Sequence, residues 1–411
     1  MKYVRVRLSE KPVACSIELP ASKSISNRLL IMNALSGNRI KISNLSDSDD
    51  TRVLQQAMQQ LHTSENPEID IQDAGTAARF LCAYLAMTGA ECTLTGSVRM
   101  QNRPIAALVS ALRDLGADIE YLQKDGFLPV RFNKADIKGN EIEIRADISS
   151  QFISALLLAG PYIKGGISLY LTGSIASWPY IEMTIKLMNR FGIICEWNDR
   201  VIKVPEGEYT GGVIEVERDW SSAAPFYGIC SIAGNMKIEF PNLMLSDLQG
   251  DSQAIDIFES MGVITSPGTN GLTICGGGPV KSFVEVDFTN CPDLAQTVMT
   301  TSACNYTEAF FTGLQTLHYK ETNRFGAMIA ELNSLGVSTR DDAISTIKIN
   351  PAFSFKPSII KTYSDHRMAM AFVVFALRIG SIVIENPDIV SKSFPGFWKQ
   401  IERAGLSVEF F

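Results

Sequence analysis

The sequence has few histidines and no closely paired cysteines. His62, His318 and His366 share no metal-ligand spacing, and the eight cysteines form no Cys-x-x-Cys pair. Structural zinc sites draw on such spacings, so we expect no metal. Most cysteines lie in apolar or strand-like runs, which favours reduced thiols in a cytoplasmic protein.

Long apolar runs and a basic leader are also missing. Runs such as FVVFALRIG and ISALLLAGPYI are shorter than the ~18 residues that a membrane span needs. The opening KYVRVRL is typical of a strand and not of a signal or transit segment. The sequence therefore predicts a cytoplasmic protein without a membrane partner.

Positive charge is scarce overall. The net charge is −7 over 411 residues, and the isoelectric point is near 5.2. An acidic chain of this kind argues against nucleic acid as a partner, because binding to a phosphate backbone needs a basic face. The length predicts two or three domains.

What the sequence does contain is a long repeat. Five amphipathic segments end at a glycine and turn into a strand-like run, and these glycines are 69 to 76 residues apart: 116, 192, 262, 336 and 405. Such glycines are typical of left-handed helix C-caps.

Polar loops that precede helices follow the same rhythm. Their markers are separated by 53, 74, 72, 72 and 72 residues: Ser22, Gly75, Ser149, Ser221, Asp293 and Asp365. Both patterns predict six copies of one α/β unit, with the first copy shortened near LHTSENPEIDI and three copies in each of two compact halves.

Cations cluster beside these loops although the chain is acidic. If the helices within each half run parallel, their positive N-terminal poles converge, and bases placed there favour an anionic ligand. The alternative is six ordinary capped turns. The cations concerned are Lys23, Arg28, Arg79, Arg103, Lys320, Arg324, Arg367 and Lys392.

The stretch SDHRMAM at 364 to 370 shows the two readings side by side. Asp365 is expected to cap the helix that follows, and His366 and Arg367 then project from its first turn. They are either solvated polar residues or part of an anion site. In KETNR, Lys320 and Arg324 are four residues apart, which predicts one helix face and a repulsion that an anion between them would reverse.

Three of these stretches, LPASKSISNR at 19 to 28, KETNRF at 320 to 325 and SDHRMAM, carry a family resemblance. Together with DAGTAAR, RPIAALVSALRDLGA, SSQFISALL and SKSFPGFW, they resemble the 5-enolpyruvylshikimate-3-phosphate synthase family, in the same order along nearly the whole chain. The resemblance implies a two-domain inside-out α/β barrel of six βαβαββ-like repeats. It places repeats four to six in residues 1–20 plus 219–411, repeats one to three in residues 21–218, and the active site in the cleft between the domains.

The resemblance also implies the reaction and the ligands. The enolpyruvyl group of phosphoenolpyruvate moves to the 5-hydroxyl of shikimate 3-phosphate and phosphate is released, with no cofactor and no metal. Both substrates are small anions that carry a phosphate and a carboxylate, which accounts for the cations. We expect a monomer that binds neither nucleic acid nor membrane.

Matching motifs assign the site residues. By resemblance, shikimate 3-phosphate is bound by Ser24, Arg28, Ser149, Ser150, Gln151, Ser177, Tyr180, Asp293, Thr316 and Lys320. Phosphoenolpyruvate is bound by Lys23, Gly75, Arg103, Gln151, Arg324, Arg367 and Lys392. Catalysis is assigned to Asp293, which accepts the 5-hydroxyl proton, to Glu321 with Lys23, which serve the methylene carbon, and to His366 beside that acid.

Five positions depart from the family pattern. Thr316 replaces a common asparagine, His318 an arginine, Asp73 an asparagine, Ala21 a glycine and Phe80 a proline. Asp73 adds a negative charge near two anionic ligands, and the lost contacts predict weaker substrate binding.

Two other functions remain open from the residues. One is enolpyruvyl transfer to UDP-N-acetylglucosamine, whose enzymes use a mobile-loop cysteine that SVRMQNRPI lacks. The other is a protein that binds phosphorylated metabolites without catalysis. The presence of both Asp293 and Glu321 argues against it, because carboxylates hinder anion binding.

Overall fold

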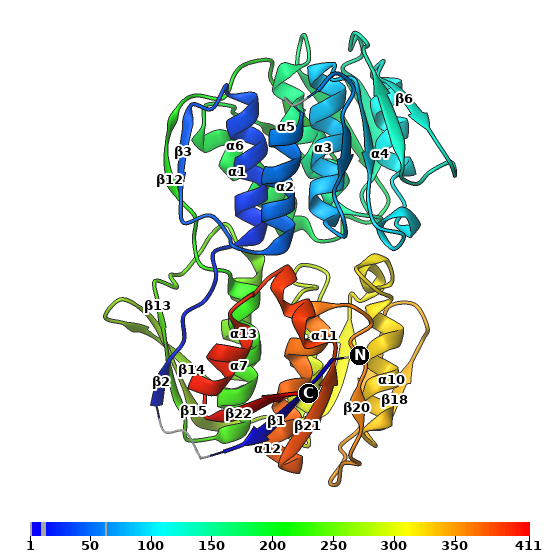
Figure 1. Cartoon of the computed structure of the whole chain (residues 1–411). Helices are drawn as coiled ribbons and strands as arrows, with labels where there is room; N and C mark the ends of the chain where they lie inside the picture. The colour runs from blue at the N-terminus through cyan, green and yellow to red at the C-terminus, as the bar shows by residue number, and fades with distance from the viewer. Residues whose placement is uncertain (1, 10–13, 62–63) are drawn as a thin grey trace. The chain divides into compact units, whose positions relative to one another are not determined.

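The computed structural model describes residues 2–9, 14–61 and 64–411, so His62 lies outside the described residues. The chain divides into two compact units (Figure 1). One, here called the split unit, combines Met1–Pro20 with Glu217–Phe411. The other, the inserted unit, is Ala21–Val216. The division falls two residues before the 218/219 boundary expected from the sequence.

The inserted unit alternates helices with short strands. Its elements are α1 (Lys23–Leu35), β3 (Ile40–Ser43), α2 (Asp49–Gln60), β4 (Glu68–Asp70), α3 (Gly75–Thr88), β5 (Cys92–Thr95), η1 (Met100–Asn102), α4 (Ala106–Asp114), β6 (Asp118–Tyr121), β7 (Val130–Asn133), β8 (Glu141–Arg145), α5 (Ser150–Ala159), η2 (Gly160–Tyr162), β9 (Ile167–Thr172), α6 (Trp178–Arg190), β10 (Glu196–Asn198), β11 (Val201–Val204) and β12 (Gly212–Glu215). They form the sheets β4-β5-β7-β6, β10-β11-β9-β8 and β12-β3.

The split unit takes two strands from the start of the chain. Its elements are β1 (Tyr3–Leu8), β2 (Ala14–Ser16), α7 (Trp220–Ala233), β13 (Lys237–Pro241), η3 (Gly250–Gln253), α8 (Ala254–Glu259), β14 (Met261–Gly268), β15 (Gly271–Val280), β16 (Phe283–Asp287), α9 (Ala295–Cys304), β17 (Glu308–Thr312), η4 (Gln315–Tyr319), α10 (Arg324–Ser334), β18 (Thr339–Asp341), β19 (Ile347–Ile349), β20 (Ile359–Ile360), α11 (His366–Ala371), η5 (Phe372–Phe375), α12 (Ala376–Ile379), β21 (Ser381–Glu385), η6 (Pro387–Lys392), α13 (Phe397–Arg403) and β22 (Leu406–Phe410). Its sheets are β14-β15-β13-β2, β16-β17-β19-β18 and β20-β21-β1-β22.

Each four-stranded sheet has the same pairing. A parallel pair, such as β8 and β9 or β16 and β17, is extended by two further strands that pair antiparallel to it and to each other. In the split unit, β2 and β1 complete two such sheets from the N-terminal segment. The sheet β12-β3 has only the parallel pair, which is the structural reason for the short first interval.

The predicted glycine caps are confirmed. All five glycines have positive φ, between 83° at Gly262 and 105° at Gly116. Four of them lie between a helix and a strand, whereas Gly262 is the second residue of β14, which begins directly after the C-cap of α8. A residue with a Cβ is strained in this region, so glycine ends each helix at low cost. The predicted loops also precede helices, namely α1, α3, α5, α7, α9 and α11.

Within each unit one set of helices is largely buried, and strands of the sheets have one face in solvent. All ten residues of α9 and all six of α11 are buried, and α3 and α5 are nearly so. The strands β8 and β16 alternate exposed and buried residues, as expected for sheets with one face in solvent. The α/β class is thus confirmed, whereas no sheet of the described residues closes into a barrel, and the barrel stays a prediction.

The described residues contain no cluster of three His, Cys, Asp or Glu side chains that could hold a metal ion. None of their helices is long and apolar enough to cross a membrane. All eight cysteines are free thiols. Burial raises the pKa of the Cys82 and Cys230 thiols to about 12, which leaves them protonated and unreactive at neutral pH.

Candidate functional site

Side-chain contacts bring four helix N-termini of the split unit together. Arg367, in the first turn of α11, donates to Ser221 in α7 and to Asp293 just before α9. Arg324, the first residue of α10, donates to Asp365, the N-cap of α11. The positive ends of α7, α9, α10 and α11 therefore lie at one end of this unit, as the sequence predicts.

Arg324 is the centre of this arrangement. Its guanidinium is 1% exposed and donates from Nε to Asp365 Oδ2 at 2.7 Å, from Nη1 to Asp293 Oδ1 at 3.0 Å and from Nη2 to Glu321 Oε2 at 2.6 Å. One buried cation thus joins three carboxylates. We call Asp293, Lys320, Glu321, Arg324, Asp365 and Arg367 the split-unit cluster.

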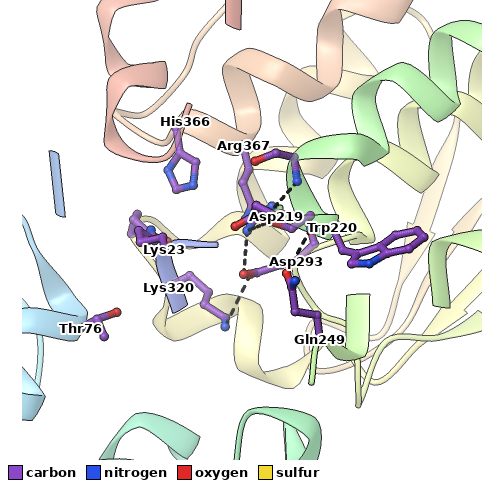
Figure 2. A network of polar contacts seen from close by, with 12 residues as sticks. Lys23, Thr76, Asp219, Trp220, Gln249, Asp293, Lys320, His366 and Arg367 are labelled. Atoms are coloured by element: carbon purple, nitrogen blue, oxygen red, sulfur yellow. Dashed lines mark hydrogen bonds and ion pairs between the residues drawn. The ribbon is translucent and has the colours of Figure 1, made fainter. Parts of the chain in front are cut away.

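Asp293 collects the other two cations of the cluster. Arg367 Nη2 donates to Asp293 Oδ2 at 2.8 Å, and Lys320 Nζ lies 3.8 Å from Oδ1. Figure 2 shows Lys320 and Arg367 reaching Asp293 from different elements. Ser221 accepts from Arg367 at 3.0 Å and donates to Asp219, the N-cap of α7, so this chain of contacts fixes the guanidinium.

These charges set the protonation of the cluster. Burial raises the pKa of Asp293, but the positive charges of Arg367, Lys320 and Arg324 outweigh it and hold the pKa well below its usual range. Burial lowers the pKa of Lys320, and Asp293 opposes that effect. Asp293 is therefore ionised at neutral pH and able to accept a proton.

The helix-face prediction for KETNR is wrong. Lys320 has an extended backbone (φ −79°, ψ −155°), and α10 begins only at Arg324, because Asn323 caps it by accepting from Gly326 N at 3.0 Å. The two cations still share an anion, which in the structure is Asp293. Asp293 itself does not cap α9, whose N-cap is Leu294 without a side-chain bond, because its carboxylate serves the arginines instead.

The capping role of Asp365 is confirmed, since its Oδ1 accepts from Arg367 N at 2.9 Å. His366 and Arg367 are only 1% and 8% exposed, so the interpretation as solvated residues is wrong. His366 Nδ1 lies 3.8 Å from Asp365 Oδ1. Lys392 is buried at the end of η6, which packs against α11.

Two of the departing positions lie in this unit near Lys320. Thr316, in η4, is 7% exposed, and its hydroxyl has no hydrogen-bond partner in the structure. His318 stacks on Phe325 with ring centroids 4.7 Å apart and bonds through Nε2 to Ile344 O at 2.9 Å. His318 therefore packs locally against α10 and its neighbouring loop.

Helix N-termini also converge in the inserted unit. Lys23, at the start of α1, donates to Asp50, at the start of α2, at 3.1 Å. At the start of α5, Gln151 donates to Thr76 at the start of α3 at 3.1 Å. Arg28 of α1 donates to the Tyr180 carbonyl in the first turn of α6 at 3.0 Å. The starts of five helices thus lie at one end of this unit.

The predicted serines of this unit cap or flank helices. Ser149 caps α5 by accepting from Gln151 N at 3.2 Å, and Ser150 is the buried first residue of the helix. Ser177 precedes α6 with a left-handed φ of 56° and makes no side-chain cap bond. Ser24 contributes its carbonyl, which accepts from Arg28 Nη1 at 2.8 Å.

Gly75 and Arg103 are in close contact. A Cβ built at Gly75 would overlap the Arg103 guanidinium, so only glycine lets Arg103 lie against the start of α3. Arg79, one turn later, donates to Gly75 O at 3.1 Å and to Pro104 O at 3.2 Å, and so ties α3 to the segment that carries Arg103. Asp73 accepts from the Ser97 hydroxyl.

Several partners in these networks were not predicted. In the inserted unit, Asp50 accepts from Lys23, and Ser154 and Thr184 accept from Arg28. In the split unit, Asp219 accepts from Ser221, which in turn accepts from Arg367. Asp219 lies in the RDWSSAA loop that the repeat singled out, so its spacing was a usable signal. The others belong to helices and carry no local signal, because their partners lie 27 or more residues away.

Comparison with solved structures gives the class of protein. EPSP synthase from Acinetobacter baumannii aligns over 100% of both chains with a TM-score of 0.80 at 22% identity. A second structure of EPSP synthase from the same organism gives 0.77 at 22% identity. The chain therefore has the two-domain α/β fold of these transferases.

Sequence comparison gives the family. The family model described as EPSP synthase (3-phosphoshikimate 1-carboxyvinyltransferase) matches residues 9–68 and 53–401. The 3-phosphoshikimate 1-carboxyvinyltransferase of Bacteroides fragilis (strain YCH46) is 43% identical, over 100% of this chain and 99% of that protein. The protein of that name from Shewanella baltica (strain OS185) is 36% identical, over 93% and 95%. The chain belongs to the EPSP synthase family.

Proposed function

We propose that the protein transfers the enolpyruvyl group of phosphoenolpyruvate to the 5-hydroxyl of shikimate 3-phosphate and releases phosphate. Family membership over the whole chain supports the reaction. The observation that carries the chemistry is the pair of carboxylates Asp293 and Glu321, both bonded to the buried Arg324. Neither transfer to UDP-N-acetylglucosamine nor binding without catalysis is supported by the comparisons.

The anionic substrates match the cations that the two units supply. For shikimate 3-phosphate we propose Ser24, Arg28, Ser149, Ser150, Gln151, Ser177, Tyr180, Asp293, Thr316 and Lys320. For phosphoenolpyruvate we propose Lys23, Gly75, Arg103, Gln151, Arg324, Arg367 and Lys392. These residues come from both units, so the reaction requires the whole chain.

The proposed chemistry is addition followed by elimination. Glu321 in its protonated form, with Lys23, gives a proton to the methylene carbon of phosphoenolpyruvate, and C2 becomes electrophilic. Asp293 accepts the proton of the 5-hydroxyl while the hydroxyl oxygen bonds to C2, and a tetrahedral ketal phosphate forms. Glu321 then removes a proton from the new methyl group, the C–C double bond re-forms, and the C2–O bond to phosphate breaks while the proton held by Asp293 passes to the departing phosphate.

The three cations around Asp293 explain how this residue can act as a base. A carboxylate held far below its usual pKa is a weak base while its three cations remain paired with it. Substrate carboxylate and phosphate groups compete for the same cations. Each such pairing weakens their effect on Asp293 and raises its proton affinity, so the base becomes effective when both substrates are bound.

His366 is proposed to assist from its buried position beside Asp365. We further propose a cytoplasmic monomer that needs no cofactor. This part rests on the sequence: an acidic chain with dispersed cysteines. Sedimentation at micromolar concentration tests the monomer directly, and a dimeric mass would refute it.

A phosphate-release assay tests the function. The purified protein should release phosphate from phosphoenolpyruvate only when shikimate 3-phosphate is present. UDP-N-acetylglucosamine, offered at the same concentration, should give only the background rate. Release with UDP-N-acetylglucosamine alone would establish the other transferase activity, and no release with either acceptor would favour a binding protein.

A further inference from the structure

Arg28 has surroundings unlike those of four other proposed site cations, Lys23, Lys320, Arg324 and Arg367. Its side chain, 2% exposed, donates from Nε to Thr184 Oγ1 at 2.7 Å and from Nη2 to Ser154 Oγ at 3.1 Å. Two carbonyls complete the set, Tyr180 O at 3.0 Å and Ser24 O at 2.8 Å. The Phe80 ring lies 5.4 Å from the guanidinium carbon. All of these partners are neutral.

These four cations differ from Arg28 in that each has a carboxylate partner. Lys23 pairs with Asp50, and Lys320, Arg324 and Arg367 all pair with Asp293. Arg28 makes no ion pair with a carboxylate among the described residues. Four of its five N–H groups are used, which leaves one Nη1 hydrogen for a ligand. Burial lowers the pKa of Arg28 to about 10, so it remains charged at neutral pH.

We infer that Thr184 and Ser154 are positioning residues, which hold Arg28 in place with neutral hydroxyls so that its charge stays available to an anionic group of shikimate 3-phosphate. This inference rests on the proposed function, in which Arg28 binds that substrate. A carboxylate in place of Thr184 or Ser154 would hold the guanidinium equally well. The carboxylate would also neutralise the guanidinium, and the substrate anion would then have to displace an internal anion.

The two hydroxyls are themselves fixed. Thr184 Oγ1 lies 2.9 Å from Tyr180 O, one turn earlier in α6, and 2.9 Å from Ser154 Oγ in α5. Both side chains are fully buried. Because threonine is branched at Cβ and its χ1 is stiff, Thr184 presents its oxygen to Arg28 in one orientation. The unit therefore places the charge by packing α1, α5 and α6 together.

Removal of the Thr184 hydroxyl tests the inference. Thr184→Val keeps the shape of the side chain and should raise the Kd for shikimate 3-phosphate about tenfold, because an arginine contact depends on alignment. The KM for phosphoenolpyruvate should stay within about twofold. Thr184→Ser restores the oxygen and should bring the Kd back to within about twofold of the wild-type value.

Thr301→Val is the matched control. Thr301 is equally buried, and its hydroxyl likewise bonds the carbonyl one turn earlier, Thr297 O at 2.7 Å, but it does not contact Arg28. Both valine variants lose one buried hydroxyl, so their thermal unfolding should shift by similar amounts. Only Thr184→Val should weaken substrate binding. Ser154→Ala provides a second variant if Thr184→Val does not fold.

A double-mutant cycle separates positioning from a general structural effect. In the Arg28→Gln background, Thr184→Val should change the Kd for shikimate 3-phosphate by less than about twofold, because the group it positions is gone. An equal loss in both backgrounds, or no loss in either, would overturn the inference. Failure of the proposed function is seen separately, in the wild-type protein. If the wild-type protein neither binds shikimate 3-phosphate nor releases phosphate, the proposed function itself is refuted.

Discussion

The substitution Asp293→Asn tests the proposed chemistry most directly. It keeps the side-chain shape but removes the carboxylate on which the three cations of the split-unit cluster converge. The cluster holds three cations and three carboxylates, so the variant has one excess positive charge. The amide oxygen can accept from one of the two guanidiniums, while its N–H groups face the other and do not bond it.

Loss of the base should lower turnover strongly. General base catalysis typically contributes about 10²–10⁴-fold, or roughly 3–5 kcal/mol in the activation barrier. Binding of shikimate 3-phosphate should change by less than about tenfold, ~1.4 kcal/mol, because the excess positive charge offsets the lost acceptor. Single-turnover phosphate release and equilibrium binding measure the two quantities separately.

Asp388→Asn is the control for a simple change in charge. Asp388 is 63% exposed and pairs with Lys2, so its substitution should leave turnover at the wild-type level. Wild-type turnover in Asp293→Asn would remove Asp293 from the mechanism. A large loss of substrate binding at normal single-turnover rate would assign it to binding alone.

The other predictions use the same assays. Glu321→Gln should lower turnover by orders of magnitude and leave the Kd for shikimate 3-phosphate within about tenfold; full activity would exclude Glu321 as the acid. Gly75→Ala places a Cβ where the Arg103 guanidinium lies and should raise the KM for phosphoenolpyruvate more than tenfold. Gly396→Ala is the control, because a Cβ has ordinary room there and the KM should not change. Equal KM values in the two variants would contradict a role of the Gly75–Arg103 contact in binding. The folded-state pKa of Asp293 is lowered, so its ionised carboxylate stabilises the folded protein above the unfolded pKa of about 4. This stabilisation is lost as the pH falls below that value. In urea unfolding, the free energy of unfolding should therefore fall less between pH 7 and pH 3 in Asp293→Asn than in wild type.

The repeat was predictable because its signals are local. A glycine such as Gly116 ends a helix through its own backbone conformation, and Asp365 caps α11 through a bond two residues away. Such features depend on residues that are neighbours in sequence. The order of strands within each sheet was not predictable in this way, since β1 and β2 pair with strands more than 200 residues later.

The sequence singles out candidate site residues that the structure brings into contact, but it does not reveal the bonds between them. The motifs predict Arg324 and Asp293 as ligand-binding residues, yet no local pattern shows that Arg324 is bonded to Asp365, 41 positions away. The helix assumed for KETNR failed for a related reason. The helix begins only at Arg324, because the Asn323 side chain caps it there. The spacing of Lys320 and Arg324 alone does not reveal this start.

The proposed site arginines of the two units differ in their partners, and this difference has a functional consequence. In the split unit, Arg324 and Arg367 are bonded to carboxylates, so a substrate anion must exchange with an internal one and thereby changes the proton affinity of the acid left behind. In the inserted unit, Arg28 is held by neutral oxygens, and Arg103 lies against the glycine at the start of α3. Neither has a carboxylate partner among the described residues. An anion that binds these two arginines cancels positive charge without displacing a carboxylate, which favours capture of substrate anions there, whereas anion binding in the split unit is coupled to the proton affinity of Asp293.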